Sequence, residues 1–71
     1  PPDAVRRATF RRLVLDLYDH RCAASGRRLR LADGTSLVEA AHLIPFSRSR
    51  DDDPRNGLAL TPDMHWAMDQ H

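Results

Sequence analysis

The sequence predicts a small α+β domain in the order helix, strand, loop, strand, helix. Three observations predict this class. Residues 5–18 place apolar side chains at helical spacing, residues 37–46 form a short apolar run bounded by turn residues, and residues 61–63 read as the start of another helix. A chain of 71 residues buries only about 60% of the surface of its unfolded form. We therefore expect a single domain, residues 1–71, with a thin core that needs additional stabilisation.

The first expected helix lies in an arginine-rich segment, residues 1–20. Its apolar residues follow the i, i+3, i+4, i+7, i+8 pattern of an amphipathic helix. They are Phe10, Leu13, Val14, Leu17 and Tyr18. Arginines occupy the other sides and are either a solvated face or phosphate ligands, because guanidinium groups bind phosphate through paired hydrogen bonds. With one arginine from later in the chain, the candidate nucleic-acid-binding residues are Arg6, Arg7, Arg11, Arg12 and Arg55.

The first expected strand, residues 37–46, follows two turn signals at Ser25-Gly26 and residues 32–35. Only Glu39 and His42 interrupt its apolar run. A run of this length fits a buried strand, although a short buried helix would show the same pattern.

The chain then leaves the sheet and returns. Residues 47–55 contain no large apolar side chain and are expected to form a surface loop with three aspartates at its centre. Asn56-Gly57 is a turn signal, and residues 58–60 are short, apolar and suited to a second strand. The two strands would form a hairpin with a long loop.

The last expected helix runs from Pro62 to the end of the chain. Thr61 supplies a hydroxyl N-cap, proline takes the first helical position, and an acid in the first turn faces the positive end of the helix dipole. His65 and Asp69 are four residues apart and share one helical face. The residues interpreted as its core face are Met64, Trp66 and Met68, with base stacking by the tryptophan as the alternative.

Charge is distributed unevenly along the chain. The formal net charge is +1, which excludes binding of nucleic acid through bulk positive charge alone. All 11 basic residues are arginine. Residues 1–30 contain eight Arg and three Asp, a net of +5, and residues 31–71 contain three Arg, six Asp and one Glu, a net of −4. We expect the basic part to contact phosphates and the acidic part to bind a cation.

Cysteine content and hydropathy bound the location. Cys22 is the single cysteine, so the chain has neither an internal disulfide nor a C-x-x-C zinc motif, and a reducing, cytoplasmic location is expected. No apolar run reaches the roughly 18 residues of a membrane span, and no membrane partner is expected. The chain starts without Met and stops within a helix. We expect it to be a domain of a longer protein.

The polar residues of the two strands and the last helix form one pattern. Taken singly, His42 fits a hydrogen-bonded core histidine, Asn56 a turn residue, and the pair His65 and Asp69 a surface contact. Together, they place a strand histidine, a turn asparagine and a helical His/Asp pair within a short segment. Such a set is able to hold a divalent ion beside a neutral imidazole, as metal-assisted phosphodiester hydrolysis requires.

Three motifs in this segment resemble the HNH endonuclease family. They are LVEAAHLIP at residues 37–45, NGLAL at residues 56–60 and DMHWAMD at residues 63–69. They are most similar to the restriction-type branch written E-A-A-H, N-G-L and D-x-H-x-x-F-D, and residues 21–26 resemble the family's lead-in. The resemblance implies a ββα-metal fold over residues 37–71, in which a hairpin packs on a helix with one divalent ion between them. It also implies an endonuclease that cuts double-stranded DNA, and a place in restriction-modification.

The resemblance also implies roles for individual residues. His42 would be the general base that takes a proton from the attacking water. Asn56 would tie the loop between the strands and orient His42 through backbone hydrogen bonds. His65 would be the final histidine of the motif and, with Asp69, would hold an ion in contact with a non-bridging oxygen and the leaving 3′ oxygen.

One position departs from the family pattern. Where many members place a metal-ligating Asp or His directly before the first histidine, this chain has Ala41. Only His65 and Asp69 would then be protein ligands, with water and phosphate completing the shell. Glu39 lies on the same strand face as Ala41, about 6.5 Å away along a regular strand, and is the expected third ligand, directly or through water. The alternative is that it pairs with an arginine, such as Arg30 or Arg55.

The expected ligands favour Mg²⁺ or Mn²⁺, since more histidines would favour Zn²⁺ or Ni²⁺. The chain contains no helix-turn-helix or zinc-finger pattern that reads base edges, so target choice is expected from a covalently linked specificity domain. The sequence also fits two functions other than an enzyme. Ala41 favours a catalytically inactive module for nucleic-acid or protein interaction, and a metal bound for folding alone would make the chain a structural domain.

Overall fold

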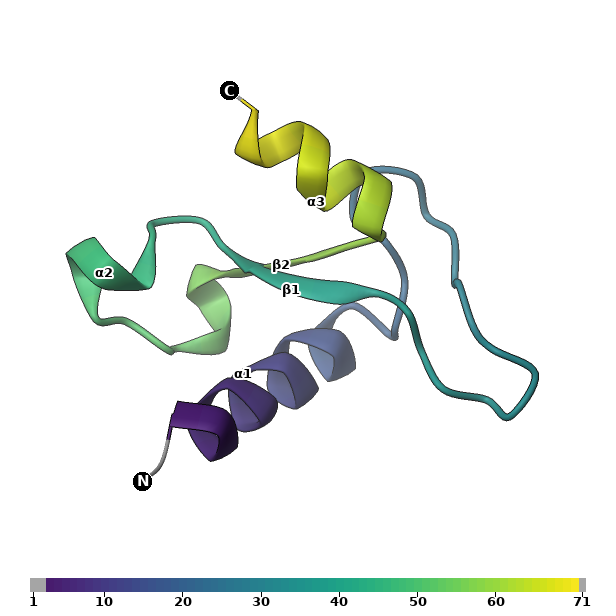
Figure 1. The fold of residues 1–71 in the computed structure, drawn as a ribbon, viewed down its shortest axis with the longest axis horizontal. Coiled ribbons are helices and arrows are strands. Elements are labelled where there is room, and N and C mark those ends of the chain that lie inside the picture. The colour runs from purple at the N-terminus through teal and green to yellow at the C-terminus, as the bar shows by residue number, and fades with distance from the viewer. Residues whose placement is uncertain (1–2, 71) are drawn as a thin grey trace.

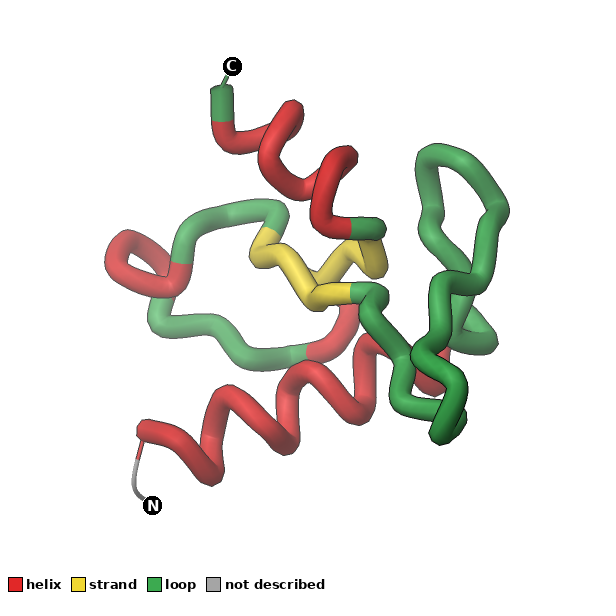
Figure 2. The backbone as a smooth tube through the Cα atoms, turned by 45° about the vertical axis from the view of Figure 1, so that its right-hand side comes forward, coloured by secondary structure: helices red, strands yellow, loops and turns green. Residues whose placement is uncertain are grey.

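The computed structural model describes residues 3–70 and has three layers. A two-stranded antiparallel sheet lies in the middle, with one helix on each face (Figures 1 and 2). In chain order the elements are α1 (Asp3–Leu17), β1 (Glu39–His42), α2 (Phe46–Ser49), the 3-10 turn η1 (Pro54–Asn56), β2 (Gly57–Leu60) and α3 (Pro62–Asp69). The predicted α+β order of helix, hairpin and helix is confirmed. The ends of the predicted domain, residues 1, 2 and 71, lie outside the described part.

The two faces of the sheet belong to different cores. Strand register pairs Glu39 with Leu60 and His42 with Gly57. Because side chains alternate along a strand, Ala40 packs on the α1 side, whereas Ala41 is buried on the α3 side. Each functional side chain of β1 therefore faces one helix or the other.

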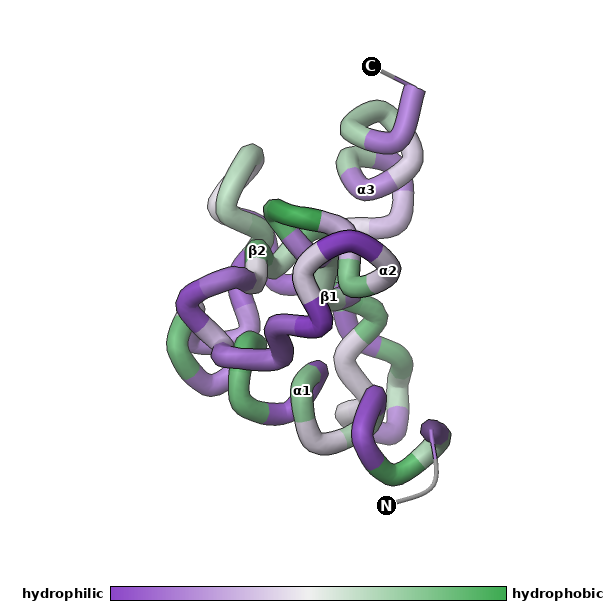
Figure 3. The backbone as a smooth tube through the Cα atoms, turned by 90° about the vertical axis from the view of Figure 1, so that its left-hand side faces the viewer, coloured by the Kyte–Doolittle hydropathy of each residue, from purple (hydrophilic) through white to green (hydrophobic). Residues whose placement is uncertain are grey.

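The core beneath α1 differs from the predicted apolar face at three positions: Leu15 is part of it, and Leu13 and Leu17 are not. Phe10, Val14 and Leu15 are buried, whereas Leu13 and Leu17 are 37% and 63% exposed. Both stripes fit a period of 3.6 residues, and the position of the sheet decides which one is covered. Each buried side chain contributes about 2 kcal/mol. Hydropathy accordingly alternates along α1 (Figure 3).

The first strand is shorter than predicted. Residues 37–46 were expected to be extended, but β1 ends at His42 and a helical turn, α2, begins at Phe46. Leu43 and Ile44 are 55% and 54% exposed. They leave the sheet because the chain turns toward Asn56, whose carbonyl accepts the amide hydrogen of Leu43 at 2.8 Å.

The loop predicted over residues 47–55 contains most of α2 and the start of η1. Asp53 caps η1 through a hydrogen bond from the amide of Arg55 at 2.8 Å. Pro54 occupies the first position of this turn, where its lack of an amide hydrogen is harmless. The segment is polar, as expected, but it is ordered by its own side chains.

The second strand, β2, begins at Gly57, where α1 lies directly against the backbone. A Cβ at this position would overlap Cγ2 of Val14 and lie 3.0 Å from Cζ of Phe10. Tyr18 Oη donates to the carbonyl of Gly57 at 3.4 Å. Any residue could adopt the extended backbone of Gly57, whose φ is −116°. Glycine is required here because a larger residue would collide with α1.

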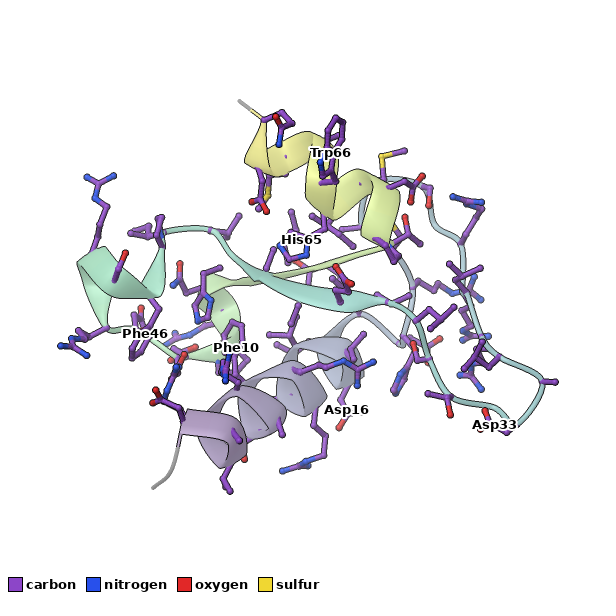
Figure 4. The ribbon with its side chains drawn as sticks, viewed as in Figure 1. Phe10, Asp16, Asp33, Phe46, His65 and Trp66 are labelled. Atoms are coloured by element: carbon purple, nitrogen blue, oxygen red, sulfur yellow. The ribbon has the colours of Figure 1, made fainter. Side chains whose placement is uncertain are left out.

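The last helix, α3, begins after Thr61 as predicted, but the hydroxyl does not cap it. Thr61 is fully buried, and its hydroxyl instead contacts Sγ of Cys22 at 3.5 Å. Met64 and Met68 pack against the sheet. Trp66 is 67% exposed and points away from the sheet (Figure 4), so its interpretation as a core residue is wrong. No helix in residues 3–70 has the length and apolar character needed to cross a membrane.

Candidate functional site

A polar cluster joins β1 to α3. Glu39 Oε1 lies 2.7 Å from Nδ1 of His65. Nε2 of the same ring lies 3.8 Å from Oδ2 of Asp69, one helical turn later. Figure 4 shows His65 between the helix and the strand. Glu39 thus contacts a histidine, and the alternative that it pairs with Arg30 or Arg55 is not what the structure shows.

The cluster fits a loosely held divalent ion. A carboxylate accepts hydrogen bonds, so Glu39 places the proton of a neutral His65 ring on Nδ1 and leaves a lone pair on Nε2, toward Asp69. Metal-binding histidines have this arrangement: one ring nitrogen binds the metal, and the other donates its hydrogen to a carboxylate. Within residues 3–70, no three His, Cys, Asp or Glu side chains are arranged so that all three could hold one metal ion. His65 and Asp69 are the pair in this cluster whose free donor atoms could share one ion.

Ala41 adds nothing to this ligand set. It is 2% exposed and packs with Leu60 beneath α3. The donor set of one imidazole and one carboxylate leaves most of an ion's coordination to water and substrate oxygens, as suits Mg²⁺ or Mn²⁺. Glu39 contacts Nδ1 of His65, whereas Asp69 faces Nε2. In this arrangement Glu39 orients the histidine ring and does not face the ion as a third ligand.

The second candidate histidine, His42, belongs to the other face of the sheet. Its ring stacks on Phe10 of α1, with parallel planes and centroids 4.0 Å apart. Phe46 of α2 borders the ring at 5.8 Å and a tilt of 53°. Nε2 lies 2.8 Å from Oδ1 of Asp52. Packing and one hydrogen bond hold the imidazole in a fixed orientation.

Asp52 is a site residue that the sequence did not single out. Besides His42, it contacts Arg6, whose Nη1 donates to Oδ2 at 2.6 Å. Burial opposes ionisation of this carboxyl, but the hydrogen bonds from Arg6 and His42 outweigh it and hold the pKa of Asp52 below its ordinary value. Three consecutive aspartates made the residue indistinguishable in the sequence, and its arginine partner is 46 positions away. No local signal could have found it.

Asn56 closes the loop that begins directly after His42. It is 8% exposed, and its amide group bonds both backbone groups of Ile44: it accepts from the nitrogen at 3.0 Å and donates to the carbonyl at 3.1 Å. It also donates to the carbonyl of Asp51 at 3.0 Å. The side chain therefore fixes both sides of the loop, but it acts on the backbone after His42 and has no contact with the ring.

The structure does not bring His42 and His65 to the same face of the sheet. His42 faces α1, and His65 meets β1 from the α3 side. His42 and Glu39 are also three residues apart, about 10 Å along a strand. In the two-stranded sheet of residues 3–70, however, β1 pairs only with β2. Among the described residues, the other edge of β1 has no strand partner and lies between the two faces.

Two of the predicted phosphate-binding arginines are used inside the fold. Arg6 pairs with Asp52 and stacks over the ring of Phe46, 3.9 Å from its centroid. Arg11 donates to the carbonyls of Ser36 at 2.8 Å and Val38 at 3.1 Å. Both attach α1 to segments that follow it and are poorly placed to bind a phosphate.

The other three candidate arginines differ in availability. Arg55 is exposed but holds Asp53 through two bonds, from Nε at 3.0 Å and from Nη2 at 2.8 Å. It also lines a surface hollow with Asp51, so phosphate would meet two carboxylates there. Arg7 and Arg12 are exposed on α1 and form no ion pair with any other part of residues 3–70. These two are available to an external phosphate.

Comparison with known proteins identifies one family. A family model described as HNH endonuclease matches residues 22–71, which include β1, the loop, β2 and α3. Neither the search of curated proteins nor that of solved structures gave a match. The matched segment contains His42, Asn56, His65 and Asp69, and it excludes α1.

Proposed function

Because the chain belongs to the HNH endonuclease family, we propose that it hydrolyses phosphodiester bonds in double-stranded DNA with one divalent ion and His42 as the general base. One observation supports this proposal most. Two of the three histidines in the matched segment, His42 and His65, each have one ring nitrogen bound to a carboxylate, Asp52 for His42 and Glu39 for His65. The other ring nitrogen, Nδ1 in His42 and Nε2 in His65, would then accept a proton or bind an ion.

Proton abstraction and metal binding would take place on opposite faces of β1. His42 would take a proton from the attacking water, with the following backbone fixed by Asn56. His65 and Asp69 would hold the ion, and Glu39 would orient His65. When bound, the ion supplies positive charge that stabilises the oxygens of the phosphodiester during cleavage.

The substrate would approach the free edge of β1, where a backbone phosphate can meet both clusters. Arg7 and Arg12, exposed on α1 in the basic part of the chain, would bind neighbouring phosphates. Mg²⁺ or Mn²⁺ suits a site with two protein ligands, and Zn²⁺ or Ni²⁺ is the alternative.

The biological setting is also a proposal. The absence of a base-reading motif from the sequence supports a linked specificity domain in a longer protein. The E-A-A-H and N-G-L motifs support a restriction-type role, and the single buried Cys22 supports a cytoplasmic location.

A second candidate is a catalytically inactive module that binds nucleic acid or protein. Two observations favour it: Ala41 occupies a ligand position of the family, and residues 3–70 contain no group of three metal-binding side chains. His42 and His65 also lie on opposite faces of the sheet.

Supercoiled plasmid tests both candidates. The protein is incubated with plasmid and Mg²⁺ or Mn²⁺, with EDTA and the His42→Ala variant as controls. Nicking that requires both metal and His42 is the expected result. DNA binding without nicking would support the inactive module. A melting temperature that depends on metal, without binding or nicking, would support a structural role for the ion.

A further inference from the structure

We infer that Asp52 is a positioning residue for His42: it accepts the Nε2 hydrogen, keeps the neutral ring in the Nε2–H tautomer and leaves Nδ1 as the atom that takes the proton of water. This inference rests on the proposed function for its catalytic meaning. The tautomer itself is a property of the folded protein and can be measured without activity.

The first support is the direction of the hydrogen bond. Asp52 Oδ1 lies 2.8 Å from Nε2 of His42, while Oδ2 accepts from Nη1 of Arg6 at 2.6 Å. The arginine keeps the carboxylate charged, and the depressed pKa of Asp52 agrees with this. A charged carboxylate only accepts hydrogen bonds. The hydrogen between Asp52 and His42 therefore belongs to Nε2.

The second support is the immobilised ring. Phe10 stacks on one face of His42 with parallel planes, and Phe46 borders it at 5.8 Å. Arg6 lies over the ring of Phe46 as well as on Asp52, so one arginine of α1 braces two neighbours of the histidine. A 180° flip about the Cβ–Cγ bond would break the contact with Asp52. The packing thus fixes the plane of the ring, and the contact with Asp52 decides which of its two edges faces the carboxylate.

The third support is the freedom of the other nitrogen. Nδ1 of His42 has no hydrogen-bond partner in residues 3–70, and it is absent from the buried side-chain atoms that lack one. Nδ1 is therefore not completely buried. Of the two ring nitrogens, Nε2 is engaged by Asp52, and Nδ1 is the one left to accept from water.

The resulting proton transfer balances. One O–H bond of water breaks, its proton forms a bond to the lone pair of Nδ1, and the hydroxide oxygen forms a bond to phosphorus as the bond from phosphorus to the leaving oxygen breaks. Solvent protonates the leaving oxygen. His42 becomes an imidazolium whose charge lies beside Asp52. The carboxylate stays ionised, stabilises this charge and orients the ring.

Nitrogen NMR of the metal-free protein with ¹⁵N-labelled histidine tests the tautomer, at a pH where the ring is neutral. We expect a protonated Nε2 and an unprotonated Nδ1 for His42 in the unaltered protein. In Asp52→Ala, both tautomers should be populated. Asp51→Asn removes a neighbouring charge without touching His42 and should leave the spectrum unchanged. A Nδ1–H ring in the unaltered protein, or no change in Asp52→Ala, would overturn the inference.

A kinetic arm connects the tautomer to function. Asp52→Asn keeps the shape of the side chain and removes its charge, so the rate constant for nicking of bound plasmid should fall by about 10-fold to 100-fold while the Kd for DNA is unchanged. Asp51→Asn should nick at the normal rate. If the unaltered protein shows the expected tautomer but no nicking, the proposed function fails, and the part of the inference that Asp52 sets the tautomer of His42 stands. Normal nicking by a folded Asp52→Asn would overturn the catalytic part of the inference.

Discussion

Glu39 Oε1 lies 2.7 Å from Nδ1 of His65, a contact that joins the first residue of β1 to the middle of α3. It links two of the three motifs that resemble the HNH family, although 26 residues separate them. The carboxylate fixes the tautomer of His65 and turns Nε2 toward Asp69. The contact makes Glu39 the residue that orients His65, the proposed metal ligand, and the first prediction depends on it.

Glu39→Gln should weaken metal binding by about tenfold, because the amide oxygen is a poorer acceptor for Nδ1–H and the amide NH2 can donate to an unprotonated Nδ1, which would place the proton on Nε2. Isothermal titration with Mn²⁺ measures the affinity. Asp63→Asn, which removes an exposed carboxylate from the same helix without touching His65, should bind Mn²⁺ normally. Equal affinities for the unaltered protein and Glu39→Gln would show that Glu39 does not act on the site.

Gly57→Ala should destabilise the fold by about 2 kcal/mol, the typical cost of overpacking a core. The added methyl group would overlap Val14, and either β2 or α1 would have to move. Urea unfolding followed by circular dichroism gives the free energy of unfolding.

Val14→Ala in the same background supplies the control for Gly57→Ala. It removes the overlapped methyl groups, so the two substitutions should cost less together than the sum of their separate costs. Strictly additive costs would contradict a direct contact between these positions.

Asn56→Asp should destabilise the fold by about 2 kcal/mol. Aspartate has the same shape but cannot donate to the carbonyls of Ile44 and Asp51. Urea unfolding measures the loss, and amide exchange of Ile44 should become faster as the loop opens. Gln70→Glu is the matched control at an exposed amide. Unchanged stability in Asn56→Asp would show that these two bonds do not hold the loop.

Acid should destabilise the protein partly through Asp52. Its pKa is lower in the folded protein than in the unfolded chain, so its stabilising contribution is complete above about pH 4, the unfolded pKa. The contribution is lost as pH falls through the folded value. In urea unfolding from pH 7 to pH 3, Asp52→Asn should lose less stability than the unaltered protein. Identical pH dependences would contradict the contacts with Arg6 and His42.

Much of the fold could be predicted from local patterns. Helical spacing predicted α1, and the proline after Thr61 predicted the start of α3, because both signals act within a few residues. The choice of Leu15 over Leu13 for the core could not be predicted, since it depends on where the sheet packs. Leu43 and Ile44 were predicted as part of the strand because they are apolar. The sequence does not show that hydrogen bonds to Asn56 turn the chain out of the sheet at this point.

The candidate site was predicted less completely. The motifs identified His42, Asn56, His65 and Asp69 by their order in the chain. The hydrogen-bond partners of the histidines are long-range contacts that no spacing shows: Arg6, for example, reads as a phosphate ligand but holds Asp52. The site is divided between the two faces of β1 because side chains alternate along a strand. The sequence did not show where this strand begins and ends, so the division could not be predicted.

Plasmid nicking by a matched pair of histidine variants tests the central claim most directly. His20 lies beyond the end of α1, paired with Asp16 at 3.3 Å, and serves as the control for His42. With Mn²⁺ present, His20→Asn should nick supercoiled plasmid at the rate of the unaltered protein, and His42→Asn should lose at least about 100-fold, as expected for removal of a general base. EDTA should abolish nicking in all three proteins. Nicking by a folded His42→Asn at the rate of His20→Asn would contradict the account.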